Sequence, residues 1–282
     1  MRTFRRVFAT LGVAFGLLVL AAPVAYDLHA THEANRVIKT MSDAVDWQHD
    51  EARMRYLAQA KAYNRRLAGL PYDEPEGGVL PYDEQLAWRG KPYMAYIHIP
   101  GIHLKVPIYH GTAEQELSAG VGHLEGRSLP VGGEASLCVL EGHSGMFTSR
   151  MFDDIRMLQP KDMLCIWTLA EPYAYRMASW EICDPDEVES RLAITPGDRV
   201  CLVTCTTTPD AFNPRGRIGV NDKRLLVWCE RCEYDEAYFA PQEAVVDELS
   251  STRAWPVLAM SGATMLVFIK YVIKRKRGRG IT

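Results

Sequence analysis

Three residue types that can support acyl transfer stand at the ends of apolar runs in this sequence. The run "RVCLVTC" ends at Cys205, "SLCVLEGH" ends at His143, and Arg224 comes directly before "LLVW". A thiol can act as a nucleophile, an imidazole can carry a proton, and a guanidinium can stabilise the oxyanion that forms on an attacked carbonyl. Because function concentrates at the rims of rigid scaffolds, these positions predict a thiol-based acyl-transfer site.

Each of these residues also has a simpler interpretation. A cysteine in an apolar strand is more often a buried core thiol, and a single histidine or arginine is more often structural or solvated. Arg215 and Arg217 compete with Arg224 for the oxyanion role. Arg224 is favoured because the start of a strand holds a side chain more rigidly than a stretch rich in Pro and Gly.

The other cysteines leave several alternatives open. The chain has seven, an odd number, so at least one is unpaired unless a second chain supplies a partner. Cys229 and Cys232 form a CxxC that suits a local disulfide or free thiols better than zinc, because no second CxxC and no suitably spaced histidine pair accompanies it. Cys201 and Cys205 lie about 13 Å apart in a regular strand and cannot pair with each other. No metal and no cofactor is predicted.

The scaffold that positions these residues is predicted to be mainly β. Residues 93–233 contain short runs rich in Ile, Val, Leu and aromatic residues, separated by Gly, Pro and Asp. Such runs are typical of a closed or sandwich-like antiparallel fold. One helical insertion is expected at Thr148–Leu158.

The segment before the β region is different in character. Apolar residues recur at helical spacing between Asp27 and Leu67, which predicts one or two amphipathic helices. Residues 69–85 then hold three prolines and three glycines, and they repeat "LPYDE" once. This stretch is predicted to be a loop, so residues 27–92 form a helical lead-in followed by a lid-like loop.

Both ends of the chain carry an apolar stretch beside basic residues. Residues 7–26 have no charge and follow Arg2, Arg5 and Arg6, and residues 254–273 precede "KRKRGRG". Each stretch is long enough to span a bilayer. The first also fits a cleavable signal, although it exceeds the usual length of a signal core. Since basic flanks stay in the cytoplasm, the sequence predicts two spans in the plasma membrane, both termini cytoplasmic and the intervening chain extracellular.

The charge of the intervening chain follows from this division. The formal net charge of the whole chain is −3, and the two ends hold nine basic residues and no acidic ones. The exported part is therefore strongly acidic, which argues against a nucleic-acid partner. The predicted regions are an N-terminal anchor or signal (residues 1–26), a helical lead-in with a lid-like loop (27–92), a catalytic β domain (93–233), a linker (234–253), a C-terminal span (254–273) and a basic tail (274–282).

Four blocks in the same order along the chain resemble the sortase family of Gram-positive bacteria. They are "IPGIHLKVPIYHGT", "GVGHLEGRSLPVGGEASLCVLEGHSG", "LVTCTTTP" and "KRLLV". The first two are most similar to class C, the pilin-polymerising sortases. The resemblance covers roughly residues 93–228. It implies a closed sortase-type β-barrel with short helical insertions and an active site at one end.

The resemblance also implies roles for individual residues. Cys205 would attack the Thr–Gly bond of an LPXTG-type sorting signal and form a thioester, and His143 would protonate the leaving amine. Arg224 would contact the substrate and stabilise the oxyanion. Thr204 would shape the site, with strand packing as its simpler role, while His123, like His110, would have a structural or supporting role. The implied partners are LPXTG-type surface or pilin proteins and an accepting amine, from a pilin lysine or a cell-wall precursor.

This chain departs from the family in two places. Cys205 and Arg224 are separated by a long polar connection, whereas many pilin polymerases place the two closer together. The Asp-Pro-aromatic lid motif of class C is absent from "LPYDEPEGG", although Tyr72 and Asp73 could replace its aromatic and acidic residues in altered order. An ordinary linker is equally compatible with this stretch.

Alternatives to a pilin polymerase differ in how the thioester is resolved, or in whether one forms. A cell-wall-anchoring sortase would use a peptidoglycan precursor amine, and a related thiol hydrolase would use water. An L,D-transpeptidase is disfavoured because its "SHGC" signature is missing. A non-catalytic extracellular β domain stabilised by disulfides would hold Cys205 in a disulfide.

Overall fold

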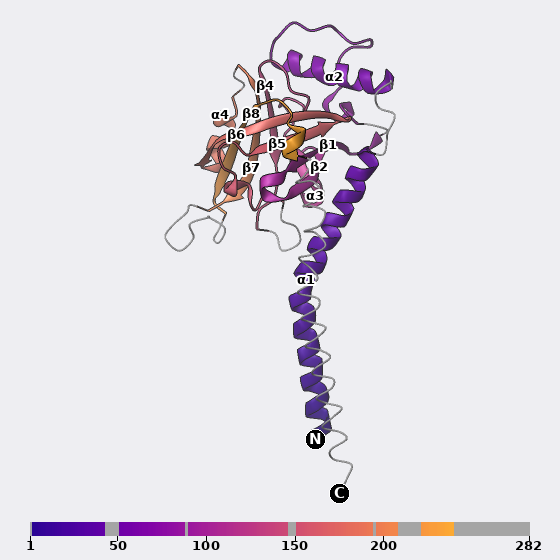
Figure 1. The fold of residues 1–282 in the computed structure, drawn as a ribbon, viewed down its shortest axis with the longest axis vertical. Helices are drawn as coiled ribbons and strands as arrows, with labels where there is room; N and C mark the ends of the chain where they lie inside the picture. Colours follow the sequence, from indigo (N-terminus) through magenta and orange to yellow (C-terminus); the bar gives the residue numbers. More distant parts are fainter. Residues whose placement is uncertain are drawn as a thin grey trace. The chain divides into compact units, whose positions relative to one another are not determined.

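The strands of the chain close into one barrel. The computed structural model describes residues 2–42, 51–87, 90–145, 151–193, 196–207 and 221–239. Within them, eight strands follow each other around the barrel in the order β1-β2-β3-β4-β7-β8-β6-β5, and β5 pairs with β1 to close it. Figure 1 shows the strands as arrows gathered in one body. The strands are β1 (Tyr93–Ile99), β2 (Leu104–His110), β3 (Val121–His123), β4 (Ser136–Glu141), β5 (Met163–Thr168), β6 (Glu171–Cys183), β7 (Asp198–Thr206) and β8 (Lys223–Arg231).

Two of the strand pairings are parallel, so the expectation of an antiparallel sheet is wrong at these places. β2 pairs in parallel with β3, and β4 pairs in parallel with β7. Parallel neighbours need a crossover connection. The helix α3 (Glu114–Ala119) lies in the connection from β2 to β3, while β5 and β6 intervene between β4 and β7. Hydrophobic periodicity indicates which side chains share a face, but not the direction of a strand.

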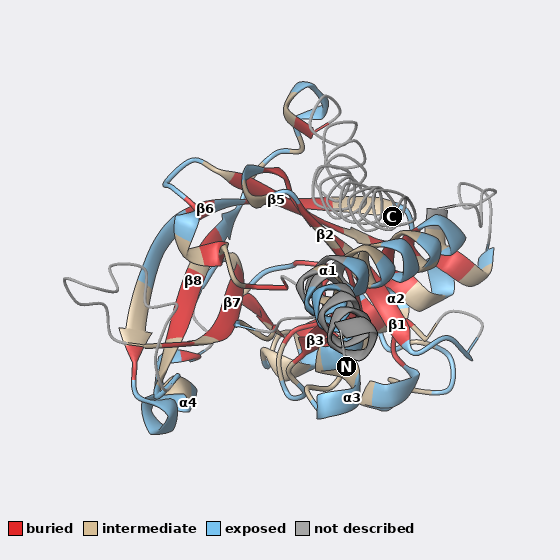
Figure 2. Ribbon diagram, turned by 90° about the horizontal axis from the view of Figure 1, so that it is seen from below, coloured by how far each residue is buried: buried red, intermediate tan, exposed pale blue. Residues whose placement is uncertain are grey.

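Strands β4, β7 and β8 are apolar on both faces. Side chains on one face, such as Leu140, Leu202 and Val227, belong to the main core of the barrel. Side chains on the other face, including Val203 and Leu226, form a second cluster of buried residues. The two faces alternate because the side-chain period of a strand is two. Strands buried on both faces read as continuous apolar runs, and β7 and β8 are red along most of their length in Figure 2.

The remaining described elements are helical and mostly short. The helical insertion expected at Thr148–Leu158 is reduced to one 3-10 turn within the residues that the structure describes, and Thr148 itself lies outside them. The helices are α1 (Arg2–Ser42), α2 (Glu51–Leu67), α3 and α4 (Val188–Arg191), and the 3-10 turns are η2 (Tyr82–Glu84), η4 (Pro100–Ile102), η5 (Ile155–Met157) and η6 (Pro185–Glu187).

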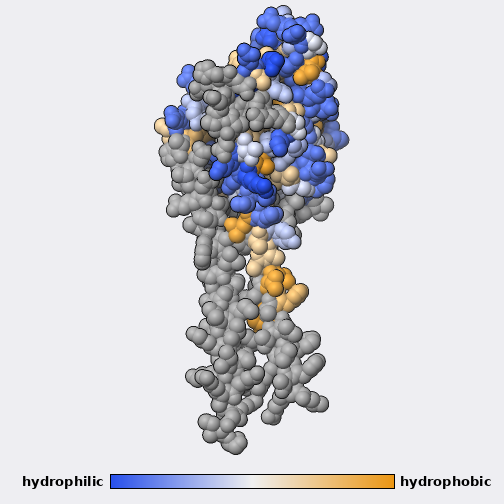
Figure 3. Space-filling model, turned by 90° about the vertical axis from the view of Figure 1, so that its right-hand side faces the viewer, coloured by the Kyte–Doolittle hydropathy of each residue, from blue (hydrophilic) through white to orange (hydrophobic). Residues whose placement is uncertain are grey.

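The N-terminal apolar stretch lies within α1, which continues without a break into the predicted lead-in. Residues up to Thr31 belong to a different unit from the barrel, whose unit begins at His32. Phe15 and Leu18 of α1 are 70% and 71% exposed, and apolar residues of this kind are orange in Figure 3. In the described part of the chain, no helix is both long enough and apolar enough to cross a bilayer. The predicted C-terminal span and basic tail lie outside the described residues, as does most of the linker before them.

Helix α2 covers one end of the barrel. Leu57, Ala60 and Tyr63 of this helix are buried in the main core. Asn64 donates from Nδ2 to the carbonyls of Leu129 (3.0 Å) and Gly132 (3.1 Å), and its Oδ1 accepts the N–H of Leu129 (2.7 Å). Buried backbone groups of the 129–132 turn are thereby satisfied, so α2 seals this end with both apolar and polar contacts.

Candidate active site

Cys205 and Arg224 lie side by side on the adjacent strands β7 and β8, at the other end of the barrel. β7 runs antiparallel to β8, and their register pairs the Cα atoms of these two residues. Directly opposed side chains in an antiparallel pair lie on the same face, with Cβ atoms about 4.5–5.5 Å apart. Both residues are half-buried. A thiol and a guanidinium therefore share one partly open surface.

His143 is held beside this pair by hydrogen bonds on both sides of it. β4 is parallel to β7, and beyond its last residue the N–H of Gly142 donates to the carbonyl of Val203 (3.1 Å). Thr204 donates from Oγ1 to the carbonyl of Gly142 (2.6 Å), and Ser144 donates from Oγ to the carbonyl of Cys205 (2.5 Å). The residues before and after His143 are thus bonded to the strand that carries the thiol.

The turn after β4 also depends on a close approach at Gly142. A Cβ atom at this position would lie 2.7 Å from the ring of Phe152, which is fully buried. Phe152 in turn donates its N–H to the carbonyl of His143 (3.0 Å). A larger residue at position 142 would have to displace this ring. The glycine of the "GHSG" block therefore lets a core aromatic side chain support the backbone of His143.

Two acidic residues lie beside the candidate residues, Glu141 near Arg224 and Glu114 near His143. Burial raises the pKa of Glu141, the last residue of β4, while the nearby Arg224 and a hydrogen bond with Thr112 lower it. Glu114 at the start of α3 places its Oε2 atom 3.3 Å from Nε2 of His143. A nucleophile, a proton carrier and a cation with acidic neighbours form an arrangement suited to acyl transfer.

Comparisons with known proteins identify the family. A family model described as "Sortase domain" matches residues 97–232. The solved structure of sortase C1 from Streptococcus agalactiae is 34% identical to this chain, with a TM-score of 0.59, and the match covers 70% of this chain and 100% of that one. The chain belongs to the sortase family.

Other solved sortases agree with this assignment. Sortase C-1 from Actinomyces oris is 37% identical, with a TM-score of 0.53, over 64% of this chain and 99% of that chain. Sortase A from Corynebacterium diphtheriae is 31% identical, with a TM-score of 0.56, over 73% of this chain and 95% of that chain. No curated protein matches the chain. The protein is therefore an enzyme, a sortase transpeptidase with a closed eight-stranded barrel, and it is most like the class C sortases.

In this sortase His123 lies at the end of β3 and packs against Tyr82. Its Nε2 atom is 2.8 Å from the carbonyl of Ser128, and its Nδ1 atom is 3.0 Å from the hydroxyl of Tyr82. The carbonyl requires Nε2 to carry the proton, which leaves Nδ1 as an acceptor. Burial lowers the pKa of His123 to about 4, so the ring is neutral at pH 7. These contacts are structural, and a role toward substrate stays a prediction.

Among the residues that the structure describes, the second copy of "LPYDE" is hydrogen-bonded to the barrel and the first is not. The hydroxyl of Tyr82 in the second copy also lies 2.9 Å from the carbonyl of His123, so Nδ1 and this carbonyl share its one proton, and the hydroxyl oxygen accepts the N–H of Gly111 (2.9 Å). Tyr72 and Asp73 in the first copy lie in the loop after α2, half-buried and exposed respectively. Among the described residues, no hydrogen bond or ion pair joins them to Cys205. Their proposed place as a lid stays untested.

All seven cysteines of the sortase are free thiols in the structure. Burial raises the pKa of Cys138, Cys201 and Cys229, so these thiols stay protonated and inert at neutral pH. Cys205 is less buried than these three. Arg215 and Arg217, the competitors of Arg224, lie outside the described residues.

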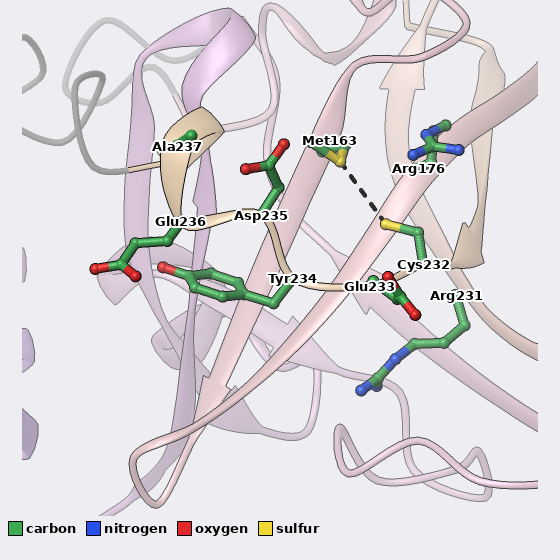
Figure 4. Close-up of a pocket in the computed structure, with 9 residues that line it drawn as sticks. All are labelled: Met163, Arg176, Arg231, Cys232, Glu233, Tyr234, Asp235, Glu236 and Ala237. Atoms are coloured by element: carbon green, nitrogen blue, oxygen red, sulfur yellow. Dashed lines mark hydrogen bonds between the residues drawn. The ribbon is translucent and has the colours of Figure 1, made fainter.

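A hollow of about 1040 Å³ lies elsewhere on the sortase, where the chain leaves β8. Figure 4 shows Met163, Arg176, Arg231, Cys232 and Tyr234 around it. The sulfur atoms of Cys232 and Met163 are 3.8 Å apart. None of the three candidate catalytic residues lines this hollow, and its charges have mixed sign.

Sequence reasoning missed Glu114, Glu141 and the contact made by Ser144. Glu141 and Ser144 stand within two residues of His143, so their proximity could have been predicted from the sequence alone. Glu114 is 29 residues upstream and reaches the site only through the crossover between β2 and β3. A parallel pairing of these two strands was the signal needed, and periodicity does not supply it.

Proposed function

We propose that this sortase is a cysteine transpeptidase that cleaves an LPXTG-type sorting signal between Thr and Gly. It transfers the acyl group through a thioester on Cys205 to an amine, a pilin lysine during pilus assembly. The observation that carries the proposal is the convergence of Cys205 on β7, Arg224 on β8 and His143 in the turn after β4 at one open end of the barrel.

In the first half-reaction the thiolate of Cys205 attacks the carbonyl carbon of the substrate threonine. A carbon–sulfur bond forms, and the carbonyl oxygen takes up negative charge that Arg224 stabilises. The carbon–nitrogen bond to glycine then breaks, and His143 donates a proton to the departing nitrogen, so the glycine peptide leaves as a neutral amine. The enzyme keeps the acyl group as a thioester.

In the second half-reaction an amine attacks the thioester carbon. The new amide bond forms as the carbon–sulfur bond breaks, and the amine's proton returns to His143 while Cys205 regains its thiolate. Both protein groups end in their starting state, so one site serves both halves. The similarity to class C sortases is what favours a pilin lysine over a cell-wall precursor as the acceptor.

The same proposal gives the protein a place at the plasma membrane. The apolar stretches at residues 7–26 and 254–273, each beside basic residues, would anchor both ends, with cytoplasmic termini and an extracellular barrel. A tethered enzyme would meet surface proteins as they emerge from the membrane. Protease accessibility of the barrel in intact cells, with protection of both termini, would test this topology.

The test of the chemistry is peptide cleavage by the full chain in membranes. An LPXTG-type peptide is incubated with and without an added amine, and products are separated by mass spectrometry. Wild-type protein should release the glycine fragment and form an amide with the added amine, whereas Cys205→Ala should do neither. The matched control is Cys232→Ala, since Cys232 is also half-buried but lies away from the site. Equal turnover by Cys205→Ala and wild type would refute the proposal, and water as the sole acceptor would indicate a hydrolase.

A further inference from the structure

The imidazole of His143 has one ring nitrogen with a specific charged neighbour. Nε2 is shielded from solvent, and within the described residues no hydrogen bond of good geometry reaches it. The carboxylate of Glu114 lies beside it, with Oε2 at 3.3 Å. The distance is that of an ion pair, although the two groups are not aligned as a hydrogen bond. A carboxylate at this distance is close enough to set the orientation of the imidazole ring.

Glu114 is held in place by its own short helix. Its second carboxylate oxygen, Oε1, accepts a hydrogen bond from Ser118 one turn later in α3 (3.1 Å). The two oxygens therefore have different partners, with the serine on one side and the histidine on the other. This division fixes the orientation of a side chain that is otherwise 78% exposed.

Two glycines of the "GVGH" block fix α3 against the barrel. A Cβ atom at Gly120 would lie 2.5 Å from the carbonyl oxygen of Pro107, and one at Gly122 would overlap the carbonyl oxygen of Gly111. Leu117 of α3 packs over Gly122. Only glycine permits this approach, so the block places α3, and with it Glu114, at a set position beside the turn that carries His143.

We infer that Glu114 is a positioning residue for His143 and completes a Cys-His-Glu arrangement at this site. This inference rests on the proposed function, in which His143 is the general acid. The carboxylate orients the imidazole through Nε2 before the leaving amine is protonated. In this arrangement Nδ1 is the ring nitrogen left to donate the proton to the leaving amine. An orienting group behind the proton carrier is a recurring feature of nucleophilic enzymes.

This arrangement predicts which step depends on Glu114. Departure of the glycine amine needs a proton from His143, because an amide nitrogen cannot leave as an anion. A thioester analogue of the same peptide releases a thiolate, which leaves without a proton. Loss of the carboxylate should therefore slow acylation by the amide substrate and spare acylation by the thioester substrate.

The test compares Glu114→Gln with wild type on both substrates, following formation of acylated protein by intact mass in single-turnover reactions. Glu114→Gln should lower the acylation rate about fivefold on the amide peptide, the effect expected from a largely exposed ion pair, with the peptide concentration that gives half-maximal rate unchanged. Its rate on the thioester analogue should equal that of wild type. Glu114→Asp, which keeps the charge, should recover part of the loss.

Control variants distinguish a failure of the inference about Glu114 from a failure of the proposed function. Glu116→Gln removes the same charge from the same helix and should act as wild type on both substrates. If Glu114→Gln matches wild type on the amide peptide, or is slowed equally on both substrates, Glu114 does not act through His143 and the inference is wrong. Acylation of Cys205→Ala in the same assay would instead overturn the proposed function itself.

Discussion

The two ends of the barrel differ in how far their side chains are buried. At the end covered by α2, Leu57 is 2% exposed, and Asn64 makes three hydrogen bonds to backbone groups of the 129–132 turn. At the other end Cys205 and Arg224 are half-buried and lie in register on adjacent strands. The covered end buries its groups and satisfies them, whereas the open end keeps a thiol and charged groups within reach of solvent. One barrel thereby separates the residues that stabilise it from those expected to react.

His143→Ala should show the largest effect, and it should be an effect on rate alone. Loss of the general acid is expected to lower kcat/KM on an LPXTG-type peptide by about 10²- to 10⁴-fold. The free energy of unfolding should change by less than about 1 kcal/mol, because the side chain is partly exposed and the turn is held by its neighbours. Peptide turnover and urea unfolding measure the two quantities. A full-rate His143→Ala enzyme would remove His143 from the mechanism.

Leu57→Ala should show the reverse pattern. Truncating this buried side chain beneath α2 is expected to lower the free energy of unfolding by about 3 to 4 kcal/mol, since a cavity is left in the core. Activity per folded molecule should stay at the wild-type level. Urea titration with activity measured below the transition tests both statements. A large loss of kcat in the folded enzyme would show that the two ends are coupled.

His123 should make stability depend on pH. Its pKa is lowered from 6.5 to about 4 by burial, so the unfolded chain binds a proton that the folded chain does not bind between these values. Stability is fully present above pH 6.5 and is lost as the pH falls through 4, by at most roughly 3 kcal/mol. The other titratable groups at this ring are Tyr82 and His110.

The measurement is urea unfolding at several pH values between 7 and 4, on wild type and His123→Gln. The glutamine variant should start less stable and should show a flatter dependence on pH in this window. The same slope in both proteins would assign the pH dependence to other groups.

Thr204→Val should show the smallest effect, and it should lower both the stability of the fold and the rate of catalysis. The substitution removes the hydrogen bond to the carbonyl of Gly142 while it keeps the shape of the side chain. Stability should fall by about 1 to 2 kcal/mol, because a buried carbonyl loses its partner. A drop in kcat with unchanged KM is also expected, since the spacing between His143 and Cys205 loosens. Thr204→Ser should restore both values, and failure of the serine to restore kcat would exclude this positioning role.

The sequence indicated the β scaffold and the residues that meet at its open end, since Cys205, His143 and Arg224 each stand at the end of an apolar run. Their catalytic roles remain predictions. The sequence did not indicate the parallel pairings, because strand direction depends on crossovers that periodicity does not report. For the same reason Glu114 was missed.

The contacts at the end covered by α2 could not be predicted from the sequence either. Asn64 bonds to Leu129, 65 residues later, and Arg53 donates from Nε to the carbonyl of Leu169, 116 residues later (2.6 Å). A polar residue in an amphipathic helix reads as solvated until its partner is known. The two "LPYDE" copies are identical in sequence, so only their tertiary contacts show which tyrosine packs against His123.

The central claim is that Cys205 carries the acyl group, and intact-mass analysis of the acylated enzyme tests it most directly. After incubation with an LPXTG-type peptide and no acceptor amine, the protein should gain the mass of the acyl fragment ending in threonine, and peptide mapping should place it on Cys205. Hydroxylamine should remove it, as expected for a thioester. An adduct on another residue, or turnover without any adduct on Cys205, would contradict the account.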